Sequence, residues 1–408
     1  MTTVVIGAQW GDEGKGKIVD FLAEDAEDIV RFSGGANAGH TIVKGGQKFT
    51  LHLVPSGILY PDTVVVLGIG MVIDIPSLFD ELNTLETQGI GWKGRVLVSD
   101  RAHVVLPRDK EEDRTLDAER RRPIGTTGRG IGVAYARKAA RDGVRVSDLV
   151  FDHTFLELPA EEQEYFAPYR ERLARMACDL TDRMISHRSR RVLLEGAQGV
   201  MLDLDLGTYP FVSSGMSAAA GAVIGSGIGP SRIDRVLGVF KAYSTRVGNG
   251  PFPSEFRAER DGDLGDRIRE LGNEYGATTG RARRCGYLDL VALRYACQSN
   301  GIDGLVMTHL DIYDSLDDIS VCTAYEIDGR HYHTVPANIL ELERAEPVIE
   351  TLPGWKRSIA DAKRYDELPG RAQDYIRFIE SRVEAPIDIV SVGSDRDQTI
   401  IRRSPWTP

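Results

Sequence analysis

The N-terminal stretch Val4-Val-Ile-Gly-Ala-Gln-Trp-Gly-Asp-Glu-Gly-Lys-Gly-Lys17 passes from an apolar run into a glycine-rich loop. The run Val4 to Ile6 is typical of a short buried strand, and the residues from Ile18 to Glu24 favour a helix. A strand, a glycine loop and a helix in this order direct backbone N–H groups and a positive helix terminus toward phosphate. We therefore expect a P-loop-like phosphate site at the start of an α/β fold.

The same loop departs from a standard P-loop at the position that binds metal. Gly11, Gly16 and Lys17 fit the pattern G-x-x-x-x-G-K, but Ile18 occupies the place of the Ser or Thr that contacts Mg²⁺. Asp12 is the carboxylate inside the loop that could bind a metal instead. A plain turn between strand and helix would account for the glycines equally well, although it would need neither this acid nor the two lysines of the loop.

A second glycine cluster, Gly34-Gly-Ala-Asn-Ala-Gly-His-Thr41, follows soon after the first. It places a polar amide and an imidazole among small residues, and small residues let a backbone approach a ligand closely. Two such loops near each other in the sequence predict a phosphate site with chemistry beside it.

The composition indicates a water-soluble globular protein. The 408 residues are 42% hydrophobic and 27% charged, and the net charge of −11 argues against a nucleic-acid surface. We expect no signal peptide and a cytoplasmic location, because no apolar stretch reaches the roughly 18 residues that span a bilayer. Four widely spaced cysteines without a C-x-x-C pair predict reduced thiols: Cys178, Cys285, Cys297 and Cys322.

Apolar segments typical of strands recur along the chain, with amphipathic helical segments between several of them. The expected strands lie at 28–32, 48–54, 63–67, 95–98, 191–194, 235–240, 304–308, 319–325 and 387–392. The expected helices include 76–88, 267–271 and 288–300. This alternation predicts an α/β protein with a mostly parallel central sheet and covering helices. We interpret residues 1–408 as a single domain with helical insertions, of which the glycine-free segment at about 152–187 is a helical excursion.

Three later motifs could carry chemistry. Ile124-Gly-Thr-Thr-Gly-Arg-Gly-Ile-Gly132 combines hydroxyls, an arginine and flexible backbone, which suits an oxyanion, although it could be only a hydroxyl-rich turn. Glu195-Gly-Ala-Gln-Gly199 follows a strand and predicts Gln198 at the carboxyl edge of the sheet, where open α/β sheets bind ligands. The segment 276–285 has three arginines beside two threonines, which favours a clamp for an anionic substrate over a solvated loop.

Two segments near the end of the chain could bind a purine base. Asp311 follows a buried strand and could accept from both N1–H and N2–H₂ of guanine, with a helix N-cap as the alternative. Ser391-Val-Gly-Ser-Asp395, after the last expected strand, could form the other wall of the pocket.

These motifs, in this order, resemble the adenylosuccinate synthetase family from about residue 3 to about residue 402. The motifs that carry the resemblance are 7–17, 34–41, 124–132, 195–199, 241–253 and 277–284. The resemblance implies a ligase that converts IMP, L-aspartate and GTP into adenylosuccinate, GDP and phosphate with Mg²⁺. It implies that Asp12 takes the N1 proton of the purine and binds Mg²⁺ together with the backbone carbonyl of Gly39, and that His40 assists phosphoryl transfer.

The resemblance also implies which residues bind the substrates. The nucleotide monophosphate would be bound by Asn37, Thr127, Gln198, Ser213, Val247 and Arg281, and by Arg141 from the neighbouring subunit of a homodimer. Aspartate would be bound by Thr279 and Arg283. GTP would be bound by Gly11, Glu13, Gly14, Lys15, Gly16, Lys17, Gly39, Thr41, His309, Asp311, Ser391 and Gly393.

The chain departs from the usual family pattern around both nucleotides. His309 stands where the family usually has lysine, and the stretch 212–221 has Gly215, Ala218 and Ala219 in place of amide and hydroxyl side chains. These differences favour, as an alternative, the same reaction on another purine nucleotide, such as GMP, dGMP or a specialised-metabolite nucleotide, with ATP as an alternative to GTP. A nucleotide-binding switch or pseudoenzyme is a remote alternative, because a switch would not need the residues that bind aspartate.

Overall fold

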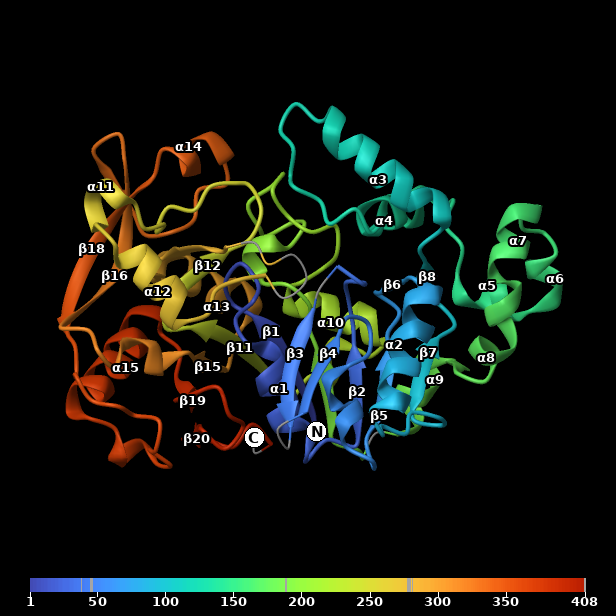
Figure 1. The fold of residues 1–408 in the computed structure, drawn as a ribbon, viewed down its shortest axis with the longest axis horizontal. Helices are drawn as coiled ribbons and strands as arrows, with labels where there is room; N and C mark the ends of the chain where they lie inside the picture. The colour runs from blue at the N-terminus through green and yellow to red at the C-terminus, as the bar shows by residue number, and fades with distance from the viewer. Residues whose placement is uncertain (38, 45–46, 188, 277–279, 281, 407–408) are drawn as a thin grey trace. The chain divides into compact units, whose positions relative to one another are not determined.

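Ten strands of the chain form one large sheet, and the computed structural model describes all residues except 38, 45–46, 188, 277–279, 281 and 407–408. Most neighbouring strands run parallel, whereas the last strand pairs antiparallel with the one before it. The expected α/β fold with a mostly parallel central sheet is therefore confirmed. The order (Figure 1) is β20 (Thr399–Ile401), β19 (Ile387–Ser391), β15 (Gly304–Thr308), β11 (Arg235–Lys241), β1 (Thr2–Gly7), β10 (Val192–Glu195), β2 (Asp28–Arg31), β5 (Val64–Leu67), β7 (Val96–Ser99) and β9 (Ala177–Cys178).

Internal contacts divide the chain into two compact units, each made of three segments. The first unit consists of Met1–Val5, Gly16–Ala197 and Ser213–Asp234. The second unit consists of Ile6–Lys15, Gln198–Val212 and Arg235–Pro408. The interpretation of residues 1–408 as a single domain stays a prediction.

The strands of the first unit follow the apolar runs of the sequence. The runs at 28–32, 63–67, 95–98 and 191–194 form β2, β5, β7 and β10, each within one residue of the expected bounds. All residues of β2 and β10 are buried, as expected for parallel strands that are covered on both faces. Short strands pair outside this sheet: β3 (His40–Lys44) with β4 (Gln47–Leu51), and β6 (Val72–Ile73) with β8 (His103–Val104).

Most helices of the first unit precede or follow these strands. The longest are α2, which buries five apolar side chains, and α3, which lies beside α4 (Figure 1). The helices up to residue 234 are α1 (Lys15–Ala23), α2 (Ile75–Thr87), α3 (Pro107–Glu119), α4 (Ile131–Ala140), α5 (Val146–Val150), α6 (Asp152–Phe155), α7 (Ala160–Phe166), α8 (Arg170–Ala174), α9 (Leu180–Ser186) and α10 (Ala219–Ser226), with 3₁₀ turns at Ser56–Leu59, Ala167–Tyr169, Val200–Leu202 and Pro230–Arg232.

Two sequence expectations need correction in the first unit. The excursion at 152–187 is not wholly helical, because Ala177–Cys178 forms β9 and pairs with β7. Two residues are too few to show a strand pattern. The strand expected at 48–54 ends at Leu51, because the Glu81 carboxylate accepts hydrogen bonds from the backbone N–H groups of residues 52–54.

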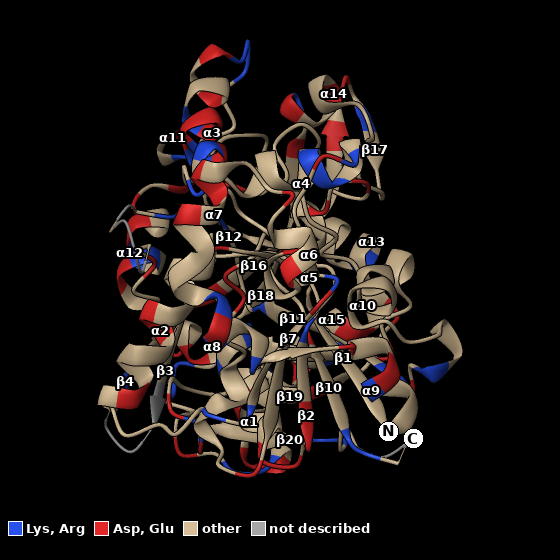
Figure 2. Cartoon of the chain, turned by 90° about the vertical axis from the view of Figure 1, so that its right-hand side faces the viewer, with Lys and Arg blue, Asp and Glu red and all other residues tan. Residues whose placement is uncertain are grey.

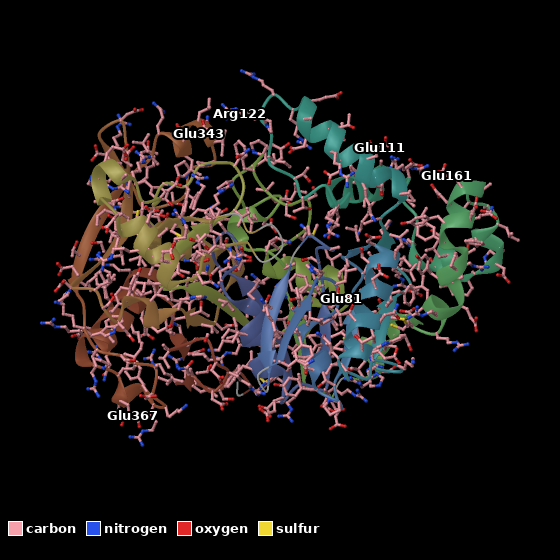
Figure 3. All side chains as sticks on the ribbon, viewed as in Figure 1. Glu81, Glu111, Arg122, Glu161, Glu343 and Glu367 are labelled. Carbon is pink, nitrogen blue, oxygen red and sulfur yellow. The ribbon has the colours of Figure 1, made fainter. Side chains whose placement is uncertain are left out.

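Charged side chains are concentrated on the outer helices. Figure 2 shows acidic and basic residues interleaved along α3, and Figure 3 shows Glu111 on that helix and Glu161 on α7. In α3 only Asp109 and Asp113 are buried. This helix therefore exposes most of its charges, and its two buried carboxylates need partners within the fold.

The second unit contributes β11, β15, β19 and β20 and adds a second sheet. This smaller sheet contains β14 (Leu288–Asp289), β16 (Asp318–Ile327), β17 (Arg330–Tyr332) and β18 (Glu346–Pro353), and β12 (Ser244–Arg246) pairs with β13 (Arg284–Gly286). The expected last strand, 387–392, is β19, but β20 follows it. The helices are α11 (Ala258–Asp261), α12 (Leu264–Leu271), α13 (Leu290–Asn300), α14 (Ile339–Glu343) and α15 (Gly370–Val383), with 3₁₀ turns at Leu310–Tyr313 (η5) and Tyr365–Glu367.

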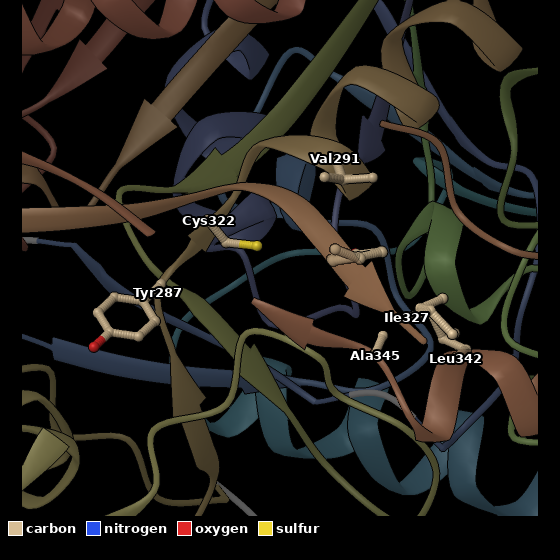
Figure 4. Close-up of a cluster of buried hydrophobic side chains, with 7 residues drawn as sticks. Tyr287, Val291, Cys322, Ile327, Leu342 and Ala345 are labelled. Carbon is tan, nitrogen blue, oxygen red and sulfur yellow. The ribbon is translucent and has the colours of Figure 1, made fainter. Parts of the chain in front are cut away.

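A hydrophobic cluster connects the second sheet to its helices (Figure 4). Tyr287, Val291, Cys322, Ile327 and Leu342 belong to this cluster and are at most 7% exposed. Cys322 is a free thiol, as are the other three cysteines, which confirms the expectation of reduced cysteines. Within the described residues, no helix is both long and apolar enough to cross a membrane.

Candidate active site

The glycine-rich loop of the second unit is built around the carboxylate of Glu13. This buried carboxylate accepts hydrogen bonds from the backbone N–H of Gln9 (3.1 Å) and of Gly11 (2.8 Å), and from Lys15 Nζ (2.6 Å). The Thr308 hydroxyl donates to the Glu13 carbonyl oxygen at 2.6 Å. The structure thus places Glu13 inside the loop and Lys15 at the first residue of α1, and their predicted contact with GTP stays a prediction.

Two glycines leave room for the Glu13 carboxylate. A Cβ atom on Gly7 would lie 2.4 Å from Glu13 Oε2, and one on Gly199 would lie 2.5 Å from Glu13 Oε1. The Gln9 side chain anchors the loop from another direction, because its amide donates to the Tyr243 carbonyl and accepts from Lys241 N, both at 3.0 Å. The second glycine of the motif 195–199 therefore has a packing role that sequence reasoning missed.

Asp12 lies in the same loop as Glu13, but its side chain is exposed where that of Glu13 is buried. Its backbone is left-handed (φ 58°), a conformation that Asp tolerates better than most residues, and its side chain is 40% exposed. Asp12 Oδ2 lies 2.9 Å from Arg283 Nε, which makes an ion pair. The loop therefore presents one carboxylate outward and keeps the other, Glu13, buried.

A buried charge network extends from Arg283. Glu274 accepts from Arg283 Nη1 (2.7 Å), from Lys241 Nζ (2.6 Å) and from the Tyr243 hydroxyl. Burial alone would raise the pKa of Glu274, but the charges of Lys241 and His309 and these hydrogen bonds lower it to about 2. Glu274 therefore stays ionised and fixes Arg283. Sequence reasoning missed this glutamate, although it directly precedes the arginine-rich segment.

Two of the three arginines of segment 276–285, Arg283 and Arg284, are described, and they contact different partners. Arg284 turns away to Glu255 and to the Gly250 carbonyl, to which it donates at 2.8 Å. Arg283 pairs with Asp12 and Glu274, while Thr279 and Arg281 lie outside the described residues, so the predicted clamp stays a prediction.

The predicted base-binding residues follow two neighbouring strands of the second unit. His309 directly follows β15 in a left-handed conformation, with its ring edge-on to that of Tyr243 at a centroid distance of 5.8 Å. Asp311 lies inside η5, whose N-cap position is His309, so the alternative of an N-cap role for Asp311 is wrong. The Ser391 hydroxyl donates to the Gly393 carbonyl at 3.0 Å.

Two predicted nucleotide-binding residues of the second unit differ in exposure. Gln198 adopts a left-handed conformation, and its buried Oε1 has no hydrogen-bond partner among the described residues. An amide oxygen in this state suits a ligand donor. Val247 is 53% exposed.

The first unit places His40 against a second buried carboxylate. His40 begins β3, and its Nδ1 lies 3.4 Å from Glu195 Oε1. The Ser56 backbone N–H donates to Glu195 Oε2 (3.1 Å), and the Ser56 hydroxyl donates to Oε1 (3.3 Å). Gly16 leaves space for the imidazole, because a Cβ there would lie 3.2 Å from the His40 Cβ.

The chain on both sides of the β3–β4 hairpin is fixed by two charged side chains, the half-buried Glu81 and the buried Arg31. Glu81 accepts from the N–H groups of His52 (3.1 Å), Leu53 and Val54 (both 3.0 Å). The fully buried Arg31 donates to the His52 carbonyl and, at 3.0 Å, to the Gly35 carbonyl. The Arg31 guanidinium therefore binds both the second glycine cluster, at Gly35, and His52, the residue that follows β4.

The loop 124–132 contains an internal carboxylate where an oxyanion was expected. Asp117 accepts from the backbone N–H groups of Ile124 (3.0 Å), Gly125 (3.1 Å) and Thr126 (3.0 Å). Asp113 accepts from Gly130 N at 2.9 Å. The N–H groups of the loop therefore bind an anion in this structure, and that anion belongs to α3.

The remaining predicted residues of the first unit are partly accessible. Arg141 is exposed at the C-cap of α4, with a left-handed backbone. Asn37 has a buried Oδ1 without a hydrogen-bond partner in the described part of the chain. Thr41 and Thr127 are exposed, whereas Lys17, Gly39 and Ser213 are half-buried.

The stretch 212–221 has a packing explanation at one of its unusual positions. A Cβ on Gly215 would lie 3.0 Å from the Tyr135 hydroxyl, which accepts from Gly34 N (2.9 Å) and donates to Gly70 O (2.7 Å). The Tyr135 hydroxyl thus occupies the space that a side chain at position 215 would need.

Comparisons with known proteins agree with this arrangement. The family model described as adenylosuccinate synthetase matches residues 4–161 and 158–400. The chain is 47% identical to the adenylosuccinate synthetase of Synechococcus sp. (strain RCC307), covering 98% of this chain and 97% of that protein. It is 46% identical to that of Moorella thermoacetica, covering 99% of each.

Two solved structures share the fold. The fully ligated adenylosuccinate synthetase from Plasmodium falciparum matches with a TM-score of 0.90 and 37% identity, over 98% of this chain and 99% of that one. The cyanophage S-2L succinoaminodeoxyadenylate synthetase, bound to dGMP and dATP, matches with a TM-score of 0.66 over 99% and 96% of the two chains. Its 21% identity indicates a common fold only.

Proposed function

The chain belongs to the adenylosuccinate synthetase family, and we propose specific roles for its residues in that family's reaction. The protein is a GTP-dependent ligase of purine biosynthesis that joins L-aspartate to C6 of IMP through a C–N bond. Because the C6 oxygen is a poor leaving group, GTP first phosphorylates it, and the aspartate amine then displaces phosphate.

Asp12 is the general base of the first step. Its exposed carboxylate takes the N1 proton of IMP, so that O6 can attack the γ-phosphorus of GTP. The observation that carries this role is the contrast within one loop, where Asp12 points outward on a left-handed backbone and Glu13 is buried. A positioned base contributes about 10²–10⁴-fold to such a step.

His40 stabilises the charge that develops on the departing phosphate of GDP. Positioned donors at such a charge are among the largest contributions to phosphoryl transfer. The contacts with Glu195 and Gly16 support this role, because they restrict where the imidazole can lie.

Arg283 binds a carboxylate of the substrate aspartate in the second step, together with Thr279. Glu274 supports this role by holding the guanidinium through Nη1. The remaining predicted residues bind the nucleotides: Asn37, Thr127, Gln198, Ser213, Val247 and Arg281 the monophosphate, and Gly11, Glu13, Gly14, Lys15, Gly16, Lys17, Gly39, Thr41, His309, Asp311, Ser391 and Gly393 GTP.

The donor set suits Mg²⁺ shared with a substrate. Mg²⁺ is usually bound through one or two carboxylates plus substrate phosphates, and it neutralises charge on the transferred group. Within the described residues no three His, Cys, Asp or Glu side chains gather as a metal cage. Asp12 supplies the carboxylate, and the Gly39 carbonyl is the second protein ligand that we propose.

A homodimer in the cytoplasm is the setting that we propose for this enzyme. Arg141 is exposed at the end of a helix, which suits contact with a neighbouring subunit's 5′-phosphate. Measuring whether Arg141→Leu raises the KM for IMP, and whether activity falls on dilution, tests the arrangement.

A matrix of substrates tests the proposed function. Turnover is measured with IMP, GMP and dGMP against GTP and ATP, following phosphate release and the new nucleotide. We expect IMP with GTP to give the highest kcat/KM. A preference for dGMP or GMP would establish the alternative acceptor, but the packing of Gly215 against Tyr135 gives that glycine a reason unrelated to substrate choice.

A further inference from the structure

We propose that Asp113 and Asp117 on α3 are positioning residues for Thr127: their carboxylates bind the loop 124–130 on both sides of that threonine and hold it ready for the nucleotide monophosphate. This inference rests on the proposed role of Thr127 and deepens it. It adds two side chains from α3, a helix to which the predicted site assigned no part.

The two carboxylates belong to a row of three on one face of α3. Asp109, Asp113 and Asp117 recur every four residues, a spacing that places successive side chains of a helix above one another. Asp109 accepts from Arg137 Nε at 2.7 Å, which ties the row to α4. The two helices lie beside each other (Figure 1), and the segment 120–130 connects them. The row therefore marks the face of α3 that is turned toward α4.

Asp117 fixes the chain that precedes Thr127. Its carboxylate accepts from the backbone N–H groups of Ile124 (3.0 Å), Gly125 (3.1 Å) and Thr126 (3.0 Å). Burial opposes the ionisation of Asp117, but these three hydrogen bonds hold its pKa below the usual range. The three donors are thus satisfied within the protein and fix the course of the loop.

Asp113 fixes the chain on the other side of Thr127. Its buried carboxylate accepts from the Thr126 hydroxyl at 3.0 Å and from Gly130 N at 2.9 Å. The Thr126 hydroxyl in turn accepts from Gly128 N at 3.2 Å, which closes a turn around Thr127. Thr127 is exposed between these anchors. The loop therefore presents the one residue that we assign to the nucleotide and attaches its neighbours to α3.

The loop needs anchors because its glycines can adopt many conformations. Gly125, Gly128 and Gly130 have φ values of 79°, 65° and 76°, a region that glycine visits about as readily as negative φ. Ordering such a segment costs conformational free energy, and a segment that is ordered only by its ligand weakens the binding of that ligand. Loss of an anchor should therefore weaken nucleotide binding more than it slows the chemical steps.

A different interpretation of the same contacts predicts the opposite effect. If the Asp117 carboxylate occupied the place of a substrate phosphate, the nucleotide would have to displace it, and its removal would tighten binding. The structure favours positioning, because two carboxylates one helical turn apart hold both sides of the turn, whereas a stand-in for one phosphate would need only one. The sign of the change in affinity separates the two interpretations.

The same helix provides matched controls. Glu111 is an exposed carboxylate of α3 (Figure 3) and is not a member of the row. Neutralising Glu111 removes the same charge from the helix. Asp109→Asn weakens the ion pair with Arg137 and leaves both loop anchors in place, so it tests the loss of a buried charge from the row itself.

The experiment compares Asp117→Ala, Asp113→Ala, Thr127→Ala and the double variant Asp117→Ala/Thr127→Ala, with Glu111→Gln and Asp109→Asn as controls. The Kd for IMP is measured by titration calorimetry, together with kcat, the KM for GTP and aspartate, and the melting temperature. We expect Asp117→Ala to raise the Kd for IMP about tenfold, as it would if the loop were ordered about one-tenth of the time. With saturating IMP, kcat should change by less than about twofold, because the anchors act on binding.

Three outcomes decide the question. In the Thr127→Ala background, Asp117→Ala should weaken IMP binding by less than about twofold further, because the residue that it positions is already truncated; a full additional loss would overturn the proposal. Tighter IMP binding in Asp117→Ala would overturn it in favour of a carboxylate that occupies the place of the phosphate. Unchanged IMP binding in Thr127→Ala would refute the proposed role of Thr127 and, with it, the need to position that residue.

Two further readouts separate anchoring from general damage to the fold. Asp117→Asn keeps one acceptor oxygen and should recover part of the affinity that Asp117→Ala loses. Backbone hydrogen exchange in the segment 120–132 should be faster in Asp117→Ala, while β2 and β10 keep the protection of wild type. An equal loss of affinity in Asp109→Asn or Glu111→Gln, without faster exchange in this segment, would show that charge or stability, and not anchoring, sets the affinity.

Discussion

Two buried glutamates, Glu274 in the second unit and Glu195 in the first, differ in their partners. Glu274 has two cations, Lys241 and Arg283, within hydrogen-bond distance. Glu195 has one imidazole and the N–H and hydroxyl of Ser56. The first arrangement is a network of ion pairs, whereas the second combines one imidazole with neutral donors. The two carboxylates are equally buried, so the difference between them lies in the kind of partner that each one has.

We expect the largest effect from substitution of Asp12, which pairs with Arg283 at the end of the charge network of the second unit. Asp12→Ala should lower kcat by about 10³-fold or more, because the purine loses its base. The melting temperature should stay near that of wild type, since the side chain is 40% exposed. Steady-state phosphate release and thermal unfolding measure the two quantities, with Asp12→Asn as the isosteric control. Turnover like that of wild type would refute the assignment and leave Arg283 as an ion-pair partner only.

Glu274→Gln tests the structural side of the comparison. Removing one partner of a buried ion network leaves uncompensated charge, so we expect a loss of about 3–5 kcal/mol in the free energy of unfolding. The KM for aspartate should rise as well, because Arg283 loses its support. Urea unfolding and aspartate titrations measure both.

The same variant predicts a pH dependence. Because the pKa of Glu274 is lowered to about 2 in the folded protein, its contribution to stability is complete above the usual carboxyl range and is lost as the pH falls toward 2. Glu274→Gln should therefore lose less stability between pH 5 and pH 3 than wild type. Parallel losses in the two proteins would show that Glu274 is not the ionised centre of the network.

Asp311→Asn asks whether the second unit also reads the base. The loss of a charged acceptor costs about 1.5–3 kcal/mol, so the ratio of kcat/KM for GTP over ATP should fall by about 10–100-fold. A parallel measurement of the KM for IMP controls for general damage. An unchanged ratio would place guanine recognition elsewhere.

Asp289 shows what burial does to the pKa of a carboxylate whose described partners include a backbone N–H and a hydroxyl. It caps α13 and accepts from the Tyr325 hydroxyl at 2.7 Å, and burial raises its pKa to about 6. Its favourable contribution is therefore present at low pH and lost as the pH rises through about 6. Asp289→Asn keeps the cap and should lose about 1–2 kcal/mol less stability than wild type between pH 4 and pH 8. Superimposable stability profiles would contradict this.

The sequence predicted most strands of the central sheet, but it did not predict the long-range contacts of buried and half-buried charged side chains. The apolar runs at 28–32, 63–67 and 304–308 predicted strands well, because a covered parallel strand is apolar throughout. The end of β4 could not be found, because it depends on Glu81, which lies far along the chain on α2. Strand β9 was missed because its two residues are too few to show a periodic pattern of apolar side chains.

The candidate site was also predicted only in part from the sequence. The glycines and charged residues of the first loop pointed to Asp12, because a plain glycine turn between a strand and a helix does not need a charged side chain. Glu195 and Glu274 gave no such signal, because a buried glutamate is recognised only through distant partners such as Lys241 for Glu274. Local sequence pattern therefore found the exposed carboxylate of Asp12 and missed these buried glutamates.

The cradle around Glu13 has a consequence for protein engineering. Gly7 and Gly199 each touch that carboxylate so closely that a single methyl group would collide with it. The N-terminal loop therefore cannot be transferred to another protein by itself. A graft of residues 7–17 must also include a glycine that takes the place of Gly199, which lies in a distant segment of this chain. In a deep mutational scan, both positions should reject even alanine.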